Sequence, residues 1–219
     1  MLGKAIKMNL EDILPLCGVV GAFFLLYEAI EAVVLFTVKP DTSGAVCGMI
    51  LVAVCAMMNL FAGCSYPVLN VDMLLRHSVT RKTAILATFG SLTLNMLCTM
   101  ALAFLLGKAD GLIADAWMKA LPWVTGVDRI EVPVWVYPAL GLGMVCLSLG
   151  VGAVLQHFGR KAFWGLWAGW MLLAVGMNII DWHVLDTLNV SAVVIAAAAA
   201  CVVSLLGGSA LILRANVKN

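Results

Sequence analysis

The sequence predicts an all-α membrane protein with six transmembrane helices in a single domain, residues 1–219. Hydrophobic residues make up 63% of the 219 residues and charged residues only 11%, whereas soluble domains carry about 25% charged residues. A membrane helix needs about 20 mostly apolar residues to cross the ~30 Å of hydrocarbon in a bilayer. Six stretches meet this requirement, approximately 13–37, 44–66, 84–106, 134–155, 162–180 and 191–213.

The segment before the first span is predicted to form a short amphipathic elbow helix. Four apolar residues recur there at helical spacing among charged neighbours, namely Leu2, Ile6, Leu10 and Ile13. A helix with this pattern lies along a membrane surface instead of crossing the membrane.

The first span contains two acidic residues, Glu28 and Glu31, which lie three residues apart and so on one helix face. An ionisable group inside a span costs about 2.5 kcal/mol or more and is by default a functional candidate. Three interpretations stay open: the span ends before these residues, the carboxyls hold the helix bundle together, or they contact a cation or proton in a pathway. Asn59 and Asn95 are candidates for the same pathway, although hydrogen bonds between helices explain them more simply.

The segment between the second and third spans, Pro67–Thr83, combines an apolar face with a basic cluster. The apolar face consists of Val68, Val71, Leu74 and Leu75, and the cluster of Arg76, His77, Arg81 and Lys82. The pattern predicts a short helix parallel to the membrane that an intracellular partner grips. A loop that merely fixes topology accounts for the basic charge equally well, but not for the apolar face.

The remaining connections are mostly short, with one exception. Lys39–Ser43 and Gln156–Lys161 are expected to be loops. The longest connection, Gly107–Pro133, carries an apolar stripe and is expected to lie on the outer interface. Small residues at Gly150, Gly152, Gly207 and Gly208, and a Gly-x-x-x-Gly step at Gly165 and Gly169, predict close helix packing within the fold or between subunits.

The distribution of basic residues predicts that both termini are cytoplasmic. Cytoplasmic segments of membrane proteins carry the excess of Lys and Arg. Most of the 13 such residues fall on one set of alternating segments, namely Lys4, Lys7, Arg76, Arg81, Lys82, Arg160, Lys161, Arg214 and Lys218. We therefore expect a multi-pass protein of a bacterial cytoplasmic membrane.

Several function classes are not supported by the sequence. The three histidines lie in different loops, so no metal site is expected. No phosphate-binding Gly-x-x-x-x-Gly-Lys-Ser/Thr loop and no Gly-x-Ser-x-Gly nucleophile are present, so no catalytic residues or cofactor are expected in this chain. The net charge of +1, without a clustered basic face, does not indicate a nucleic-acid partner.

The pentapeptide Ser78-Val79-Thr80-Arg81-Lys82 resembles a Ser-x-Thr-Arg-Lys-like signature. It is similar to a segment of the small six-helix permease subunits of bacterial type 2 ABC exporters, where it ends the coupling helix that docks on a nucleotide-binding subunit. The order of elements along the chain also resembles these permeases. The chain departs from many of them because its longest outer loop joins the third and fourth spans, instead of the fifth and sixth.

The resemblance implies a division of labour between subunits. A separate ATPase subunit would bind ATP and Mg²⁺, and a second permease subunit, identical or homologous, would complete the pathway. The cargo would be hydrophobic or amphipathic, such as a peptide, lipid or drug. The residues implied to contact the ATPase are Asp72, Leu75, Arg76, Ser78, Thr80, Arg81 and Lys82.

Two other functions stay open. Glu28 and Glu31 would suit an ion-coupled transporter or a substrate-binding membrane component, which needs no ATP. A non-transporting immunity or signalling protein would use the same six-helix scaffold to bind a ligand.

Overall fold

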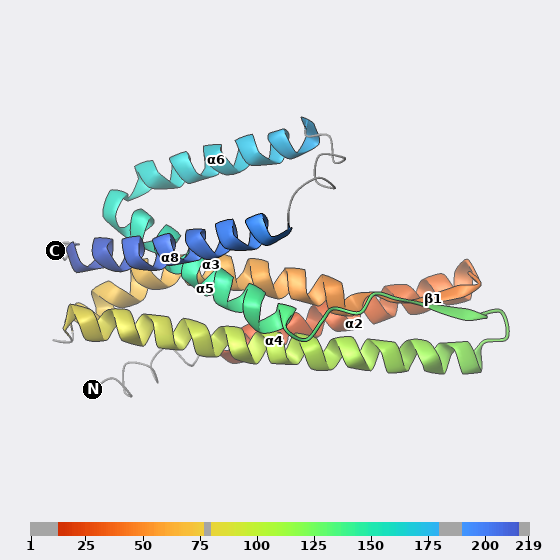
Figure 1. The fold of residues 1–219 in the computed structure, drawn as a ribbon. Coiled ribbons are helices and arrows are strands. Elements are labelled where there is room, and N and C mark those ends of the chain that lie inside the picture. Colours follow the sequence, from red (N-terminus) through yellow and green to blue (C-terminus); the bar gives the residue numbers. More distant parts are fainter. Residues whose placement is uncertain (1–12, 77–79, 180–189, 215–219) are drawn as a thin grey trace. The chain divides into compact units, whose positions relative to one another are not determined.

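The computed structural model describes residues 13–76, 80–179 and 190–214, and these are mostly helical (Figure 1). The helices are α2 (Ile13–Thr37), α3 (Cys47–Arg76), α4 (Arg81–Ala120), α5 (Val136–Phe158), α6 (Arg160–Ile179) and α8 (Val190–Arg214). Two short strands, β1 (Thr42–Ala45) and β2 (Gly126–Arg129), complete the described elements.

Among the described residues, five segments are long and apolar enough to cross a membrane, which agrees with the predicted all-α membrane class. They are Ile13–Thr37, Cys47–Ser65, Arg81–Ala120, Val136–Phe158 and Val194–Arg214. The stretch expected as the fifth of six spans, 162–180, is helical as α6 but is not among these five. The expected elbow helix lies outside the described residues.

The helices group into two compact units. Unit 1 takes its described residues from 61–89 and 145–214, and unit 2 takes them from 13–60 and 90–144. Each unit is therefore assembled from segments far apart in the sequence, and α3, α4 and α5 each contribute to both. The single domain expected from the sequence stays a prediction.

Unit 2 holds a small apolar core where α2 and α4 end. Buried Leu35 of α2 packs with Leu121 and Val124, which follow α4, and two tryptophans cover the cluster. One of them, Trp123, donates its indole N–H to the carbonyl oxygen of Leu35 at 3.3 Å. This hydrogen bond ties the end of α2 to the segment after α4.

The two strands form a parallel pair within unit 2. Thr42 lies opposite Gly126, and Ala45 lies opposite Arg129. The expectation of a plain loop over Lys39–Ser43 was therefore wrong in its second half. The turn before β1 places Lys39 at a φ of 53°, a left-handed conformation that is uncommon outside glycine.

Helix α4 is longer than the third predicted span. The helix boundary expected at Gly107 was wrong, because α4 continues to Ala120. Gly107 is instead a contact point: a Cβ at this position would lie 2.8 Å from the Cα of Gly48. The glycine pair therefore lets the backbones of α3 and α4 approach closely.

The separate coupling helix expected in Pro67–Thr83 is not seen in the described residues. Residues 67–76 continue α3 past Pro67, and Arg81 begins α4. Within unit 1, Pro67 packs against α5, where a Cβ on Gly152 would lie 2.7 Å from the proline Cγ. Val71 and Leu74 are also buried, so part of the apolar face predicted for membrane contact is covered by the protein itself.

Close packing in unit 1 also joins α5 to α8. A Cβ on Gly208 would lie 2.9 Å from the Cα of Gly150, and Ser204 donates a hydrogen bond to the carbonyl oxygen of Cys146 at 3.0 Å. The expected close approach is confirmed at Gly150, Gly152 and Gly208. For Gly207 no close approach is seen among the described residues, so packing between subunits stays a prediction there.

Candidate functional site

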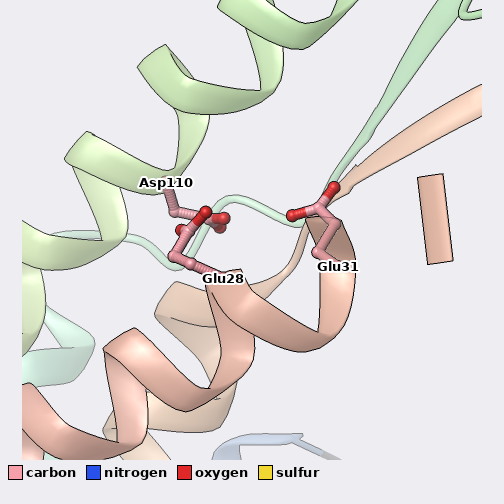
Figure 2. Close-up of side chains that lie close together, drawn as sticks. All are labelled: Glu28, Glu31 and Asp110. Atoms are coloured by element: carbon pink, nitrogen blue, oxygen red, sulfur yellow. The ribbon is translucent and has the colours of Figure 1, made fainter. Parts of the chain in front are cut away.

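Three carboxylates from two helices meet in unit 2. Glu28 and Glu31 of α2 lie beside Asp110 of α4, and Figure 2 shows the three side chains turned toward a common region. One oxygen from each residue lies within 4.8 Å of the others. We call these three residues the carboxylate cluster.

Glu31 is fixed by the chain that follows α2. Its Oε1 accepts hydrogen bonds from the hydroxyl of Ser43 at 2.6 Å and from the backbone N–H of Gly44 at 2.9 Å. The Tyr27 hydroxyl, one helical turn before Glu31, donates to the carbonyl oxygen of Gly44 at 3.0 Å. These contacts hold β1 against α2 and fix the direction of the Glu31 carboxylate.

Asp110 is fixed by the beginning of α3. Its Oδ2 accepts a hydrogen bond from the backbone N–H of Cys47 at 2.9 Å. Cys47 is the first residue of α3, where N–H groups have no partner within the helix and where the helix dipole favours negative charge. The Asp110 side chain is 1% exposed, so α4 supplies a buried cap to its neighbour.

Three further oxygens of the cluster have no hydrogen-bond partner among the described residues. Glu28 Oε1, Glu31 Oε2 and Asp110 Oδ1 are buried and accept no hydrogen bond. Among the described residues, the one ion pair joins Arg129 and Asp115, so no described basic side chain neutralises the cluster. Buried charges are normally paired or bound to a metal, which makes the cluster chemically incomplete.

A small cavity reaches the cluster from one side. Its volume is about 190 Å³, and Glu31 lines it together with Tyr27, Thr42 and Gly44. A water molecule occupies about 30 Å³ of liquid volume, so the cavity is large enough for a hydrated ion to approach Glu31.

The two asparagines predicted for the pathway form their hydrogen bonds with residues outside the carboxylate cluster. Asn59 is buried and donates to the Thr99 hydroxyl of α4 at 2.9 Å and to the carbonyl oxygen of Cys55 at 2.7 Å. Asn95 is also buried, and its carbonyl oxygen accepts from the Thr99 hydroxyl at 3.0 Å. For Asn59 this bonding agrees with the simpler expectation, a hydrogen bond between helices, whereas the bond to Asn95 uses its backbone carbonyl and lies within α4.

The predicted partner-binding residues lie on both sides of the α3–α4 connection. Leu75 is half-buried at the end of α3, and Thr80 and Lys82 are exposed at the start of α4. Arg81 donates from Nη1 to the carbonyl oxygen of Leu213 in α8 at 2.5 Å. Asp72 and Arg76 belong to α3, but their side chains, and the whole of Ser78, lie outside the described residues.

Asp110 is the site residue that the sequence prediction missed. It was assigned to an outer loop because Gly107 was taken as the end of the third span. The available signal was the apolar stripe after Gly107, which has helical spacing and is in phase with a continuous helix.

Comparison of the chain with protein-family models, with curated proteins and with solved structures gave no match. The functional argument therefore rests on the residues of this chain.

Proposed function

We propose that the chain is the membrane-spanning permease subunit of an ATP-driven ABC exporter in a bacterial cytoplasmic membrane. The observation that carries the proposal is the segment Thr80-Arg81-Lys82 at the start of α4. It matches the signature of type 2 permeases and directly follows the connection from α3. Its cargo would be a hydrophobic or amphipathic molecule, and both termini would be cytoplasmic.

The contacts of this segment support a docking role. The side chains of Thr80 and Lys82 are exposed, so they are available to a soluble partner. Arg81, in contrast, is held by the carbonyl oxygen of Leu213. Movement imposed on the start of α4 by an ATPase would therefore be passed directly to the end of α8, as coupling requires.

The exposed apolar surface supports a second permease subunit. In each of the spans Ile13–Thr37 and Val194–Arg214, only 11% of the most apolar 18-residue stretch is buried. Lipid, a second copy or a homologous permease would cover these faces, and a pathway lined by two subunits needs such an interface.

The proposal is tested by copurification. The tagged full-length chain is extracted in mild detergent, and the proteins bound to it are identified by mass spectrometry. We expect an ATPase subunit in the wild-type sample and its loss from Lys82→Glu. Lys119→Glu, the same charge reversal at the exposed far end of α4, serves as the matched control and should keep the ATPase.

Two results would contradict the proposal: no ATPase with the wild-type chain, or equal recovery with Lys82→Glu and the control. Lys82 is preferred to Arg81 for this test because its side chain is exposed and makes no contact that the fold depends on.

The carboxylate cluster favours a second candidate, an ion-coupled or substrate-binding transporter component. Acidic residues within membrane spans often line proton or cation pathways. This function predicts transport in vesicles that needs no ATP and that is lost when Glu28→Gln and Glu31→Gln are combined. Transport that stops without ATP would contradict it.

A further inference from the structure

We propose that Glu28, Glu31 and Asp110 form a binding site for Ca²⁺ in unit 2, where α2, β1, α3 and α4 meet. The site rests on the geometry of the cluster and on the burial of Asp110, and it depends on neither function proposed above. It also revises the expectation, drawn from the histidines, that the chain has no metal site.

The ligand geometry is set before an ion binds. One oxygen of Glu31 is held by Ser43 and Gly44, and one oxygen of Asp110 is held by the N–H of Cys47. In both residues the opposite oxygen is buried and free of hydrogen bonds. Hydrogen bonds to the outer oxygen of a carboxylate ligand are the arrangement that orients ligands in metal sites.

Burial of Asp110 supplies the independent argument for a bound cation. This side chain is 1% exposed, its Oδ1 is buried without a hydrogen-bond partner among the described residues, and its carboxylate lies beside that of Glu28 (Figure 2). Capping of α3 accounts for Oδ2 only. The capping of α3 therefore explains only one of the two carboxylate oxygens of Asp110. A bound cation would explain the other oxygen.

The spacing of the oxygens fits Ca²⁺. Oxygen ligands lie about 2.3–2.6 Å from Ca²⁺, so two ligands of one ion are at most about 5 Å apart. The three carboxylate oxygens lie within 4.8 Å of one another, which is inside this limit. Ca²⁺ takes about six to eight oxygens, and the cavity beside Glu31 has room for the waters that would complete the shell.

The ion would join elements that come from separate parts of the chain. Glu28 and Glu31 come from α2, and Asp110 comes from α4, while their outer oxygens hold β1 and the start of α3. A bound Ca²⁺ would therefore stabilise one end of unit 2 by bridging these segments.

Binding is tested directly with the purified full-length chain. Protein in detergent is stripped with a chelator and titrated with ⁴⁵Ca²⁺ by equilibrium dialysis up to millimolar concentration, the range for extracellular Ca²⁺ modules of about 10⁻⁴–10⁻³ M. We expect one saturable ion per chain. Glu28→Gln and Asp110→Asn should each weaken binding about tenfold or more, whereas Asp128→Asn, an exposed acid of β2, should leave it unchanged.

Thermal unfolding separates a lost ligand from a lost fold. Ca²⁺ should raise the unfolding midpoint of the wild type and of Asp128→Asn but not that of Glu28→Gln, although all three should unfold cooperatively without Ca²⁺. The proposal is overturned if the wild type binds no Ca²⁺, if Glu28→Gln binds as tightly as the wild type, or if the midpoint responds to pH and not to Ca²⁺. The last result would mean that the carboxyls share protons instead of an ion.

Discussion

At the scale of single residues, Asn59 shows how a polar group is accommodated between apolar helices. Its amide donates to Thr99 across the α3–α4 interface, and the Thr99 hydroxyl in turn donates to the carbonyl oxygens of Asn95 and Met96. Within the hydrocarbon of a bilayer, no water is available to accept a hydrogen bond from an unpaired donor. These hydrogen bonds therefore fix which faces of α3 and α4 contact each other at this position along the helices.

The strength of this contact can be measured by a double-mutant cycle. Asn59→Leu, Thr99→Val and the double variant are compared by unfolding in mixed detergent. We expect a coupling free energy of about 0.6 kcal/mol, with an upper value of ~1.7 kcal/mol, as for other hydrogen bonds between membrane helices.

Thr37→Val is the control for this cycle, because the Thr37 hydroxyl is exposed and bonds only within its own helix. It should show no coupling to Asn59→Leu. Equal coupling for Thr37 and Thr99 would show that the cycle measures something other than the contact.

Ser43 offers a second test at this scale. Its hydroxyl is buried and donates to Glu31 Oε1 at 2.6 Å. A hydrogen bond to a charged group contributes about 1.5–3 kcal/mol, so Ser43→Ala should lower the free energy of unfolding by about this amount. Ser65→Ala removes an exposed hydroxyl that bonds within α3 and should change stability by less than about 0.5 kcal/mol; an equal loss in both variants would contradict the argument.

Individual site residues were predictable when the signal was local. Glu28 and Glu31 stand out because charged side chains are costly within an apolar helix. Asn59 stands out because it is a polar side chain within an apolar helix. Asp110 was not predictable in this way, because its role depends on α4 passing the start of α3. That approach is decided by tertiary packing, which a single sequence does not display.

At the scale of elements, α4 is the member that brings the cluster together. Its 40 residues correspond to about 60 Å at 1.5 Å per residue, twice the ~30 Å of hydrocarbon in a bilayer. Part of α4 therefore extends beyond the hydrocarbon. Asp110 and the aromatic core around Leu121 belong to its final turns and the segment after it.

Two glycines of α4 should respond in opposite ways to the same substitution. A Cβ on Gly107 meets the backbone of Gly48, whereas one on Gly111 meets nothing within 4 Å. Gly107→Ala should lower the free energy of unfolding by about 1–3 kcal/mol through overpacking. Gly111→Ala should raise it by up to about 1 kcal/mol, the difference in helix propensity.

Thermal or detergent unfolding of both variants checks this prediction. A stabilising effect of Gly107→Ala would show that α3 and α4 do not touch at Gly48. In that case Asp110 would also lose its place beside the start of α3.

Helices were predictable from long apolar runs, while their ends and the strands were not. The span starting at Ile13 was placed correctly because a stretch of 25 mostly apolar residues leaves little choice. The strands Thr42–Ala45 and Gly126–Arg129 have only four residues each, too few to show alternation. They pair because α2 and α4 end near each other, and this proximity results from tertiary packing.

At the scale of the whole molecule, α6 presents a packing surface that no other described segment uses. The Gly-x-x-x-Gly step at Gly165 and Gly169 was expected to pack closely, but a Cβ at either glycine would meet no described residue within 4 Å. Such steps allow close approach of helices in membranes. The surface is therefore suited to the second permease subunit proposed above.

The prediction is that Gly169→Leu reduces the dimer fraction severalfold in chemical cross-linking of membranes. Ala168→Leu adds a similar side chain at the neighbouring exposed position and should leave the dimer fraction unchanged. Equal effects of the two substitutions, or no effect of Gly169→Leu, would exclude this face as the subunit interface.

The grouping of the helices could not be predicted from the sequence. The sequence shows no clear internal repeat that would divide the chain into two consecutive halves. The observed units instead each combine an early and a late part of the chain. Close contacts such as Gly150 with Gly208 decide this grouping, and they involve positions more than 50 residues apart.

This interleaved composition has a consequence for biosynthesis. The described segments of unit 2 end at residue 144, so they are complete while the last helices are still being made. Unit 1 depends on α8, because Arg81 bonds to Leu213 and Gly150 packs on Gly208. During synthesis the partners of Asp110 are therefore made before it, whereas Leu213, the partner of Arg81, is made more than 100 residues after Arg81.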